Sequence, residues 1–262
     1  MTAAATLGQG MDQGMDLTAD LPPVGLAALV EEAALLARVD RKYVVPRADL
    51  PHLVAALPTG TRVLEIDGRR RFGYASTYLD TPDRESYLGS GRGRRDRWKV
   101  RLRDYLDTGG RWLEVKTAGP RGRTVKQRTP AARWDADGEA FVADAVGRPV
   151  ASALRPVLVT AYDRSTLLLP GSCTRVTLDT DLAWQRPDTG DRLERPGLAI
   201  VETKSGATPS AVDRTLWARG HRPVRLSKYG AGAAALDAAL PRLKWNDALV
   251  RHLGVAPAAR RS

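Results

Sequence analysis

The sequence has almost no cysteine. Cys173 is the only one among 262 residues, which excludes an internal disulfide bond and is typical of a reducing cytoplasm. There is also no run of about 18 apolar residues, so no membrane-spanning helix is predicted. Residues 1–20 lack the basic region and apolar stretch of a secretory signal. Aromatic residues make up only 6%, which leaves few side chains for stacking on nucleic-acid bases.

Acidic residues are scarce relative to basic ones. There are 41 Lys and Arg residues against 30 Asp and Glu residues, which gives a net charge of +11 and an isoelectric point near 10.2. Such a charge predicts a polyanionic partner, whether a nucleic acid, a membrane surface or a chain of phosphates. Composition does not choose between these classes, so the positions of the charges have to decide.

One domain is expected to hold most of the chain, because no internal repeat or sharp change in composition divides it. Residues 1–23 are rich in Gly, Ala, Gln and Asp without a period, and we expect a disordered tail there. The folded domain is expected to span residues 24–242, and residues 243–262 to form a loose basic tail. Apolar periodicity predicts helices at residues 26–36, 48–57, 137–146, 209–219 and 229–240.

Alternation with period two dominates from residue 70 to residue 128. In the predicted strand 97–103, Lys99, Arg101 and Arg103 share one face, and apolar residues occupy the other. The same division into one charged and one apolar face recurs in other segments. Their charged faces hold Asp40 and Lys42, Glu114 and Lys116, Lys126 and Arg128, Tyr162 and Arg164, Arg175, Asp179 and Asp181, and Glu202 and Lys204.

Two α+β architectures are compatible with these strands. A sandwich would turn the apolar faces inward and hydrate the charged ones. A closed barrel can do the reverse, with a polar lumen and apolar outer faces that helices cover. The number of charged strands and the predicted helices favour the barrel, and the sandwich stays open as the alternative. Burial of a cation without a counter-charge destabilises a protein by about several kcal/mol. In the lumen of a barrel, a bound polyanion would supply the negative charge that the cations need.

Three carboxylates on the charged faces are candidate metal ligands: Glu114, Asp179 and Glu202. Hard divalent cations such as Mn²⁺ or Mg²⁺ prefer oxygen ligands and are often shared with phosphate oxygens. Salt bridges to neighbouring Lys or Arg side chains are the alternative role for each carboxylate.

A series of motifs runs in order along residues 40–43, 76–82, 99–105, 113–116, 161–164, 175–179, 201–204 and 226–229. This series resembles the VTC domain, the polyphosphate-polymerase relative of the triphosphate tunnel metalloenzymes, which also include the CYTH phosphatases. The resemblance covers roughly residues 38–240. CYTH phosphatases open with the motif Glu-x-Glu-x-Lys. In this chain Arg38 replaces the first glutamate of that motif and Lys42 matches its lysine, which fits the VTC branch better.

The resemblance implies an antiparallel eight-stranded β-tunnel with helices packed on the outside and Mn²⁺ or Mg²⁺ as cofactor. It implies that Glu202 is the principal metal ligand. The implied catalytic, phosphate-holding residues are Lys42, Arg101, Arg103, Lys116, Arg164 and Lys228. Further candidates for phosphate binding are Lys99, Lys126, Arg128, Lys204 and Arg225, the last of which lies three residues before Lys228.

The expected function is that of a metal-dependent polyphosphate polymerase, which transfers the γ-phosphate of ATP to a growing polyphosphate chain. The alternatives are an inorganic triphosphatase or nucleoside triphosphatase of the CYTH type, and a non-catalytic polyanion-binding protein. A basic, glycine-rich loop at residues 89–95 supports nucleic-acid binding, but the shortage of aromatic residues disfavours it. We expect a cytoplasmic protein, either free or peripheral to a membrane, and the sequence leaves a membrane-protein partner and the oligomeric state open.

Overall fold

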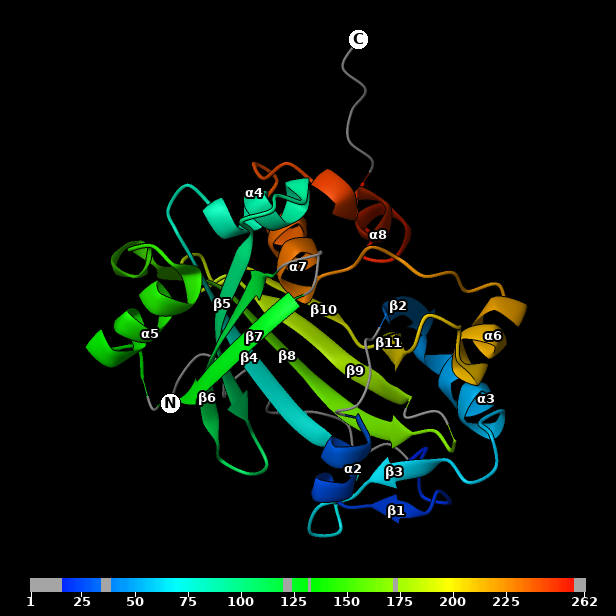
Figure 1. The fold of residues 1–262 in the computed structure, drawn as a ribbon. Coiled ribbons are helices and arrows are strands. Elements are labelled where there is room, and N and C mark those ends of the chain that lie inside the picture. Colours follow the sequence, from blue (N-terminus) through cyan, green and yellow to red (C-terminus); the bar gives the residue numbers. More distant parts are fainter. Residues whose placement is uncertain (1–15, 34–38, 120–123, 132, 172–173, 257–262) are drawn as a thin grey trace.

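An antiparallel sheet forms the centre of the molecule (Figure 1). The computed structural model describes residues 16–33, 39–119, 124–131, 133–171 and 174–256. Eight strands follow one another in the order β2-β11-β9-β8-β4-β5-β6-β7. In that order they span Val39–Pro46, Leu198–Ser205, Arg175–Gln185, Arg155–Leu168, Phe72–Asp80, Trp98–Tyr105, Arg111–Ala118 and Thr124–Pro130. The predicted eight antiparallel strands are confirmed, and in the described residues the edge strands β2 and β7 do not pair with each other.

Short strands extend the sheet at its margins. β3 (Arg62–Leu64) pairs with β8, β1 (Pro23–Val24) pairs in parallel with β3, and β10 (Arg192–Arg195) pairs with β9. Leu17 and Leu21 also pack against buried residues. Residues 16–24 are therefore folded, which differs from the disordered tail predicted for residues 1–23. Residues 1–15 lie outside the described part.

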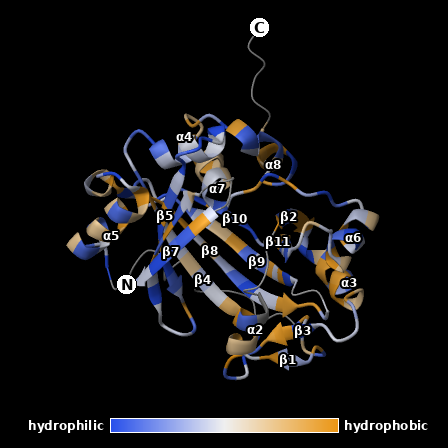
Figure 2. Cartoon of the chain, viewed as in Figure 1, coloured by the Kyte–Doolittle hydropathy of each residue, from blue (hydrophilic) through white to orange (hydrophobic). Residues whose placement is uncertain are grey.

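Helices cover the outer, apolar faces of the strands, as predicted (Figure 1). They are α2 (Leu26–Ala33), α3 (Leu50–Ala55), α4 (Glu85–Arg92), α5 (Ala136–Val146), α6 (Ala211–Ala218), α7 (Lys228–Leu236) and α8 (Asn246–Arg251). On one side Val142 of α5 packs on Val100 and Val115. On the other, α3 and α6 cover β2, β9 and β11, where Tyr43 and Val201 are fully buried. Figure 2 shows hydrophilic and hydrophobic residues mixed along the strands, as this division of faces requires.

Helix α7 differs from the others because it packs on the inner face of the sheet. Val44 and Ile200 lie two residues along their strands from the charged inner residues Lys42 and Glu202, and Leu158 lies six from Arg164, so they share that face. These apolar side chains form one buried cluster with Tyr229 of α7 and with Trp184. One end of the inner space is therefore apolar and occupied by α7.

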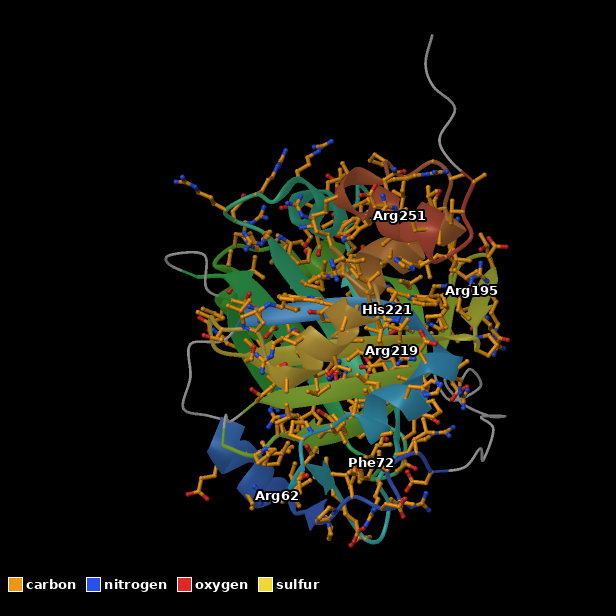
Figure 3. The ribbon with its side chains drawn as sticks, turned by 90° about the vertical axis from the view of Figure 1, so that its right-hand side faces the viewer. Arg62, Phe72, Arg195, Arg219, His221 and Arg251 are labelled. Carbon is orange, nitrogen blue, oxygen red and sulfur yellow. The ribbon has the colours of Figure 1, made fainter. Side chains whose placement is uncertain are left out.

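The chain beyond residue 242 is folded, so the predicted loose tail is wrong for residues 243–256, while residues 257–262 lie outside the described part. A 3-10 turn at Leu243–Trp245 leads into α8. Trp245 and Leu249 are buried in the same cluster as α7. Arg251, labelled on α8 in Figure 3, is exposed. The net basic charge of this segment predicted a tail exposed to solvent, but its few apolar residues are enough to pack the segment against α7.

The basic loop predicted at residues 89–95 is helical for its first half, since α4 runs from Glu85 to Arg92. The carboxylate of Asp80, which is fully buried, anchors this helix by accepting hydrogen bonds from the amides of Ser86 and Tyr87. It also accepts a hydrogen bond from the Tyr229 hydroxyl. One side chain of β4 thereby holds α4 and α7 together, and a glycine-rich sequence becomes a fixed element at the same end as α8.

Gly230→Ala is expected to destabilise the protein. A Cβ at residue 230 would lie 2.2 Å from Cζ2 of the buried Trp245, so the ring would have to move. Alanine favours a helix over glycine by about 1 kcal/mol, but overpacking of this kind costs about 2 kcal/mol or more. Gly89→Ala is the matched control, because its nearest neighbour would be Arg97 at 3.8 Å. Thermal unfolding should show a lower Tm for Gly230→Ala alone, and equal values for both would contradict the tight contact.

Candidate functional site

The charged faces of the strands point to the same side of the sheet as α7, into a space that we call the lumen. Its cations come from several strands and from the first residue of α7. They are Lys42, Lys99, Arg101, Arg103, Lys116, Lys126, Arg164, Lys204 and Lys228. The cations outnumber the carboxylates that share these faces, which are Asp40, Glu114, Asp179 and Glu202.

The sheet curls far enough to bring distant strands together around the lumen. Four strands separate β6 from β11. Burial lowers the pKa of Lys116 on β6, yet Glu202 on β11 is near enough to oppose that shift. Similarly, burial and nearby cations, among them Lys42 on β2, lower the pKa of Lys99 on β5. Direct contacts agree, since Lys99 of β5 donates a hydrogen bond to Ser227, and the next residue, Lys228, donates one to Asp179 of β9. These strands therefore face one shared space, and the sandwich alternative does not fit.

Glu114 holds two lumen cations from both neighbouring strands. Arg101 Nε lies 2.7 Å from its Oε2, and Lys126 Nζ lies 2.7 Å from its Oε1. The carboxylate is only 1% exposed. Burial raises its pKa, but Arg101, Arg103 and Lys126 outweigh that effect and hold the pKa well below its usual range. Glu114 is thus ionised, and both of its oxygens are engaged.

Asp179 plays the same part on the opposite wall of the lumen. Arg164 donates two hydrogen bonds to it, from Nε to Oδ1 at 2.6 Å and from Nη2 to Oδ2 at 2.8 Å. Lys228 also donates to Oδ2. Burial raises the pKa of this carboxyl, and Arg164 and Lys228 bring it below its ordinary value. Both oxygens are again engaged, and the Arg164 fork is fixed in orientation.

Glu202 is engaged through one oxygen only. Lys42 Nζ lies 3.0 Å and Lys204 Nζ 2.5 Å from Oε1, and Lys204 also lies 3.1 Å from Asp40. Both lysines meet Glu202 at Oε1, and in the described residues no hydrogen bond reaches Oε2. Burial raises its pKa, but the two lysines keep the pKa well below its usual range. This carboxylate keeps an ionised oxygen available in the lumen.

The three predicted metal ligands are therefore not equivalent. Glu114 and Asp179 have no free oxygen, whereas Glu202 has one. The described residues contain no group of three or more His, Cys, Asp or Glu side chains that could enclose a metal. The donor set thus fits a divalent cation that takes one ligand from Glu202 and the others from a phosphate chain.

Tyr162 belongs to the site, although the sequence reasoning assigned it no role. Its hydroxyl oxygen accepts a hydrogen bond from Arg103 Nη2 at 3.3 Å, and Lys228 Nζ lies 4.2 Å from its ring centroid. Burial raises the pKa of Tyr162, but Arg103, Arg164 and Lys228 reverse this and lower it below the ordinary value. Its position two residues before Arg164, on the same face of the strand, was the sequence signal that could have identified Tyr162 as a site residue.

Two lumen lysines have no carboxylate partner in the described residues, namely Lys99 and Lys116. Lys99 donates a hydrogen bond to Ser227 Oγ at 3.0 Å. Burial, with Arg101 as the next largest cause, lowers the pKa of Lys99 to about 7. The same two causes place the pKa of Lys116 well below its usual value. These lysines are held close to other cations without a direct carboxylate partner, so an anion would bind there favourably.

Two of the predicted phosphate-binding residues lie away from this centre. Arg128 is exposed on the edge strand β7, with its guanidinium 4.7 Å from the Trp112 ring centroid. Arg225 is exposed in the segment before α7 and is not joined to the lumen by any contact in the described residues. Arg38 and Cys173 lie outside the described residues.

A β-bulge removes Asp181 from the face on which it was predicted. The pairing of β8 with β9 shifts between Ala161 and Asp163, and Asp181 has a φ of 51°. As a result Asp181 pairs with Arg47 at 2.5 Å, outside the lumen. The residues beyond the bulge, such as Leu182, point toward α7 instead.

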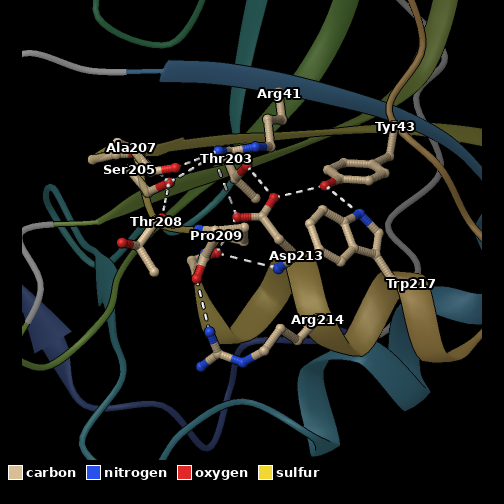
Figure 4. Close-up of polar contacts among 12 residues, drawn as sticks. Arg41, Tyr43, Thr203, Ser205, Ala207, Thr208, Pro209, Asp213, Arg214 and Trp217 are labelled. Carbon is tan, nitrogen blue, oxygen red and sulfur yellow. Dashed lines mark hydrogen bonds and ion pairs between the residues drawn. The ribbon is translucent and has the colours of Figure 1, made fainter.

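A buried polar network behind the lumen holds β2, β11 and α6 together (Figure 4). The carboxylate of Asp213 accepts hydrogen bonds from the hydroxyls of Tyr43 at 2.7 Å and Thr203 at 2.6 Å. These residues are the chain neighbours of Lys42 and Glu202, which point the opposite way. Asp213 therefore fixes the register that places Lys42 opposite Glu202.

The chain is similar to several solved structures and to one protein family. No helix in the described residues is long and apolar enough to cross a membrane. No curated protein matches the chain significantly. Among solved structures, the chain is similar to a candidate adenylyl cyclase of Hippeastrum, described as having a dominant triphosphatase activity (13% identity, 79% of this chain and 99% of that one, TM-score 0.48). It is also similar to a candidate adenylate cyclase of Bacillus halodurans (13% identity, 72% and 93%, TM-score 0.47).

The sequence itself carries the stronger relationship. The family model for the VTC domain matches residues 37–237, which is most of the chain and includes every strand from β2 to β11 together with α7. The chain therefore belongs to the VTC domain family.

Proposed function

We propose that this protein is a metal-dependent polyphosphate polymerase that transfers the γ-phosphate of ATP to the end of a polyphosphate chain. The observation that carries the proposal is the lumen, in which half-buried cations from distant strands converge and outnumber their carboxylates. Phosphoryl transfer needs little covalent chemistry from a protein, because in-line positioning and charge stabilisation do most of the work.

In the proposed mechanism the arginines orient the donor. Arg164 and Arg101 already present fixed guanidinium forks to carboxylate oxygens, and phosphate oxygens have the geometry to take over these bonds. Lys116 and Lys228 would hold the acceptor chain. A terminal oxygen of that chain attacks the γ-phosphorus, the bond to the ADP oxygen breaks, and the ADP leaves with its electron pair. A divalent cation on Glu202 would neutralise charge on the phosphate oxygens.

Incubation of the purified protein with ATP and Mn²⁺ tests this proposal. Gel analysis should show long, phosphatase-resistant polyphosphate chains and an equivalent amount of ADP. Release of inorganic phosphate without chains would instead make it a triphosphatase or nucleoside triphosphatase, with water as the acceptor. Binding of polyphosphate without turnover of ATP would make it a polyanion-binding protein.

A pair of variants ties the activity to the lumen. Lys42→Ala removes a cation 3.0 Å from Glu202 and should abolish chain formation. Arg192→Ala removes a half-exposed arginine of β10 that pairs with Glu194 at the surface, and it should leave chain formation unchanged. Equal activity of the two folded variants would separate catalysis from the lumen.

Triphosphate binding is expected to draw a proton into the lumen near neutral pH. The pKa of Lys99 is about 7 because of burial and the adjacent Arg101, and a bound anion would raise it. Lys99 is therefore partly neutral in the free protein above pH 7 and becomes charged on binding, so affinity should fall as the pH rises from 7 to higher values. Calorimetry in buffers of different ionisation enthalpy measures the uptake. Lys99→Met controls for the ligand's own titration, and an identical uptake by this variant would contradict the role of Lys99.

A further inference from the structure

A row of basic residues continues from the lumen toward the end of the molecule formed by α4, α7 and α8. Lys99 belongs to the lumen, and Arg97 lies two residues earlier on the same face of the chain. Next to them stands Lys244 of the C-terminal segment, which lies beyond the residues matched by the VTC family model. Burial lowers the pKa of Lys99, and among its causes are both Lys244 and the lumen residue Lys42. Lys99 is thus close to cations on both sides.

Lys244 is held in a defined position. Its ammonium group donates a hydrogen bond to the carbonyl oxygen of Ser90 on α4, and it lies 5.7 Å from the ring centroid of Trp245. The Tyr87 hydroxyl donates to the carbonyl oxygen of Pro241 at 2.7 Å, which ties the preceding residues to α4 as well. Because Trp245 is buried against α7, the side chain of Lys244 is fixed beside the lumen.

The charge of this row is not compensated by the protein. In the described residues no carboxylate lies within ion-pair distance of Lys99, Lys116 or Lys244. Burial, Arg97 and Arg225 all lower the pKa of Lys244. Repulsion between neighbouring cations raises the free energy of the ligand-free protein, and a bound anion lowers it again. We expect such an anion here, as at Lys99 and Lys116.

The use of lysine supports the same conclusion independently. The chain has 34 arginines but only seven lysines. Six of the lysines face the lumen, and the remaining one is Lys244. Elsewhere the chain uses arginine for positive charge. Lys244 therefore shares the residue preference of the phosphate-binding lumen and not that of the protein surface.

We propose that Lys244, with Lys99 and Arg97, forms a second subsite that holds the part of a polyphosphate chain extending out of the lumen past α4. The proposal rests on the proposed function for its ligand class, which is linear inorganic polyphosphate longer than triphosphate. A triphosphate binds to the lumen cations alone and does not reach the subsite. The subsite therefore raises the affinity for long polyphosphate chains but not the affinity for triphosphate.

Lys244→Gln and Arg251→Gln form a matched pair for the test, because both remove one positive charge from the C-terminal segment. Arg251 is exposed on α8 and is not among the main charges that lower the pKa of Lys99 or Lys244. Calorimetric titration with triphosphate and with long-chain polyphosphate, at one fixed salt concentration, should show that Lys244→Gln weakens long-chain binding about fivefold. Triphosphate affinity should stay unchanged, and Arg251→Gln should change neither. Lys244→Arg, which keeps the charge, should retain long-chain affinity.

The outcomes separate the subsite from the function on which it rests. Equal weakening of both ligands, or of neither, by Lys244→Gln would overturn the subsite while the wild-type protein still binds triphosphate. Loss of affinity for a single-stranded oligonucleotide, with polyphosphate binding intact, would show that the row serves nucleic acid instead. If the wild-type protein binds neither triphosphate nor polyphosphate, the proposed function itself fails. The unfolding temperature of each variant shows whether a loss reflects misfolding.

Discussion

Lys116→Met should reduce polyphosphate synthesis by about 100-fold or more and at the same time make the free protein more stable. Lys116 is surrounded by Arg101, Lys99 and Arg103, and burial together with these charges lowers its pKa well below the usual value. Removal of a buried charge that stabilises a transition state costs about 10²–10³ in rate. Replacement of an uncompensated buried charge by an apolar side chain stabilises a fold by about 1 kcal/mol or more. Function and stability therefore move in opposite directions.

The pH dependence of this stabilisation has a definite sign. The pKa of Lys116 is lower in the folded protein than in the unfolded chain, so the unfolded state binds more protons between the two values. The penalty that Lys116 imposes is fully present below its folded pKa and disappears as the pH rises toward about 10, the unfolded value. The Tm of Lys116→Met should thus exceed that of the wild type at pH 7, by a margin that shrinks at high pH.

Lys126→Met supplies the contrast, since it removes a lysine from the neighbouring strand. Lys126 lies 2.7 Å from Glu114, which is only 1% exposed, so the change leaves a buried carboxylate with one partner fewer. We expect this variant to be less stable than the wild type, by about 1 kcal/mol. Thermal unfolding of both variants at pH 7 decides the matter. A lower Tm for Lys116→Met would show that its charge is compensated in the free protein.

Period-two alternation predicted correctly which side chains of β5 share one face. Lys99, Arg101 and Arg103 alternate with residues of an apolar face, and that face packs on α5 as expected. Alternation is a local property of an extended chain, and the apolar outer face leaves it no freedom to slip by one residue. For the same reason the pairs Glu114–Lys116 and Glu202–Lys204 were placed correctly relative to each other.

Features that depend on contacts between distant segments of the chain could not be predicted from period-two alternation. The bulge at Asp181 reverses the facing of all later residues of β9, and its sequence carries no glycine or proline to mark it. Helix α7 was predicted as a helix, but not as the element that fills one end of the lumen. Its position depends on Gly230 and Gly232, which leave room for Trp245 and Trp184. The sequence around Trp245 is basic, so its composition predicted a solvent-exposed tail and not a segment that packs against α7.

Three of the lumen carboxylates share a physical role that explains why the free protein can keep its cations together. Each of them, Glu114, Asp179 and Glu202, holds two cationic side chains. These pairs preserve the positions of the arginine and lysine groups in the absence of ligand. A phosphate chain then competes with carboxylates for bonds that already have the required geometry, which lowers the cost of ordering the site.

Glu202→Gln should lower the rate of chain formation by about 10²–10³ and abolish binding of Mn²⁺ in the presence of triphosphate. The lysines that contact Glu202 meet it at Oε1, which leaves Oε2 for a metal, so the metal would lose the carboxylate ligand proposed for it. The amide also frees Lys42 and Lys204 from a negative charge. Triphosphate should consequently bind this variant several-fold more tightly than the wild type when no metal is present.

Electron paramagnetic resonance of Mn²⁺ and metal-free calorimetry measure these two effects separately. Glu194→Gln is the matched control, because Glu194 lies on β10 with a half-exposed side chain paired to Arg192. It should change neither Mn²⁺ binding nor triphosphate affinity. Since Lys42 and Lys204 occupy the other oxygen of Glu202, we also expect the wild-type protein to bind Mn²⁺ weakly until phosphates draw these lysines away. Strong Mn²⁺ binding by Glu202→Gln, or by the wild type without triphosphate, would place the metal on other residues.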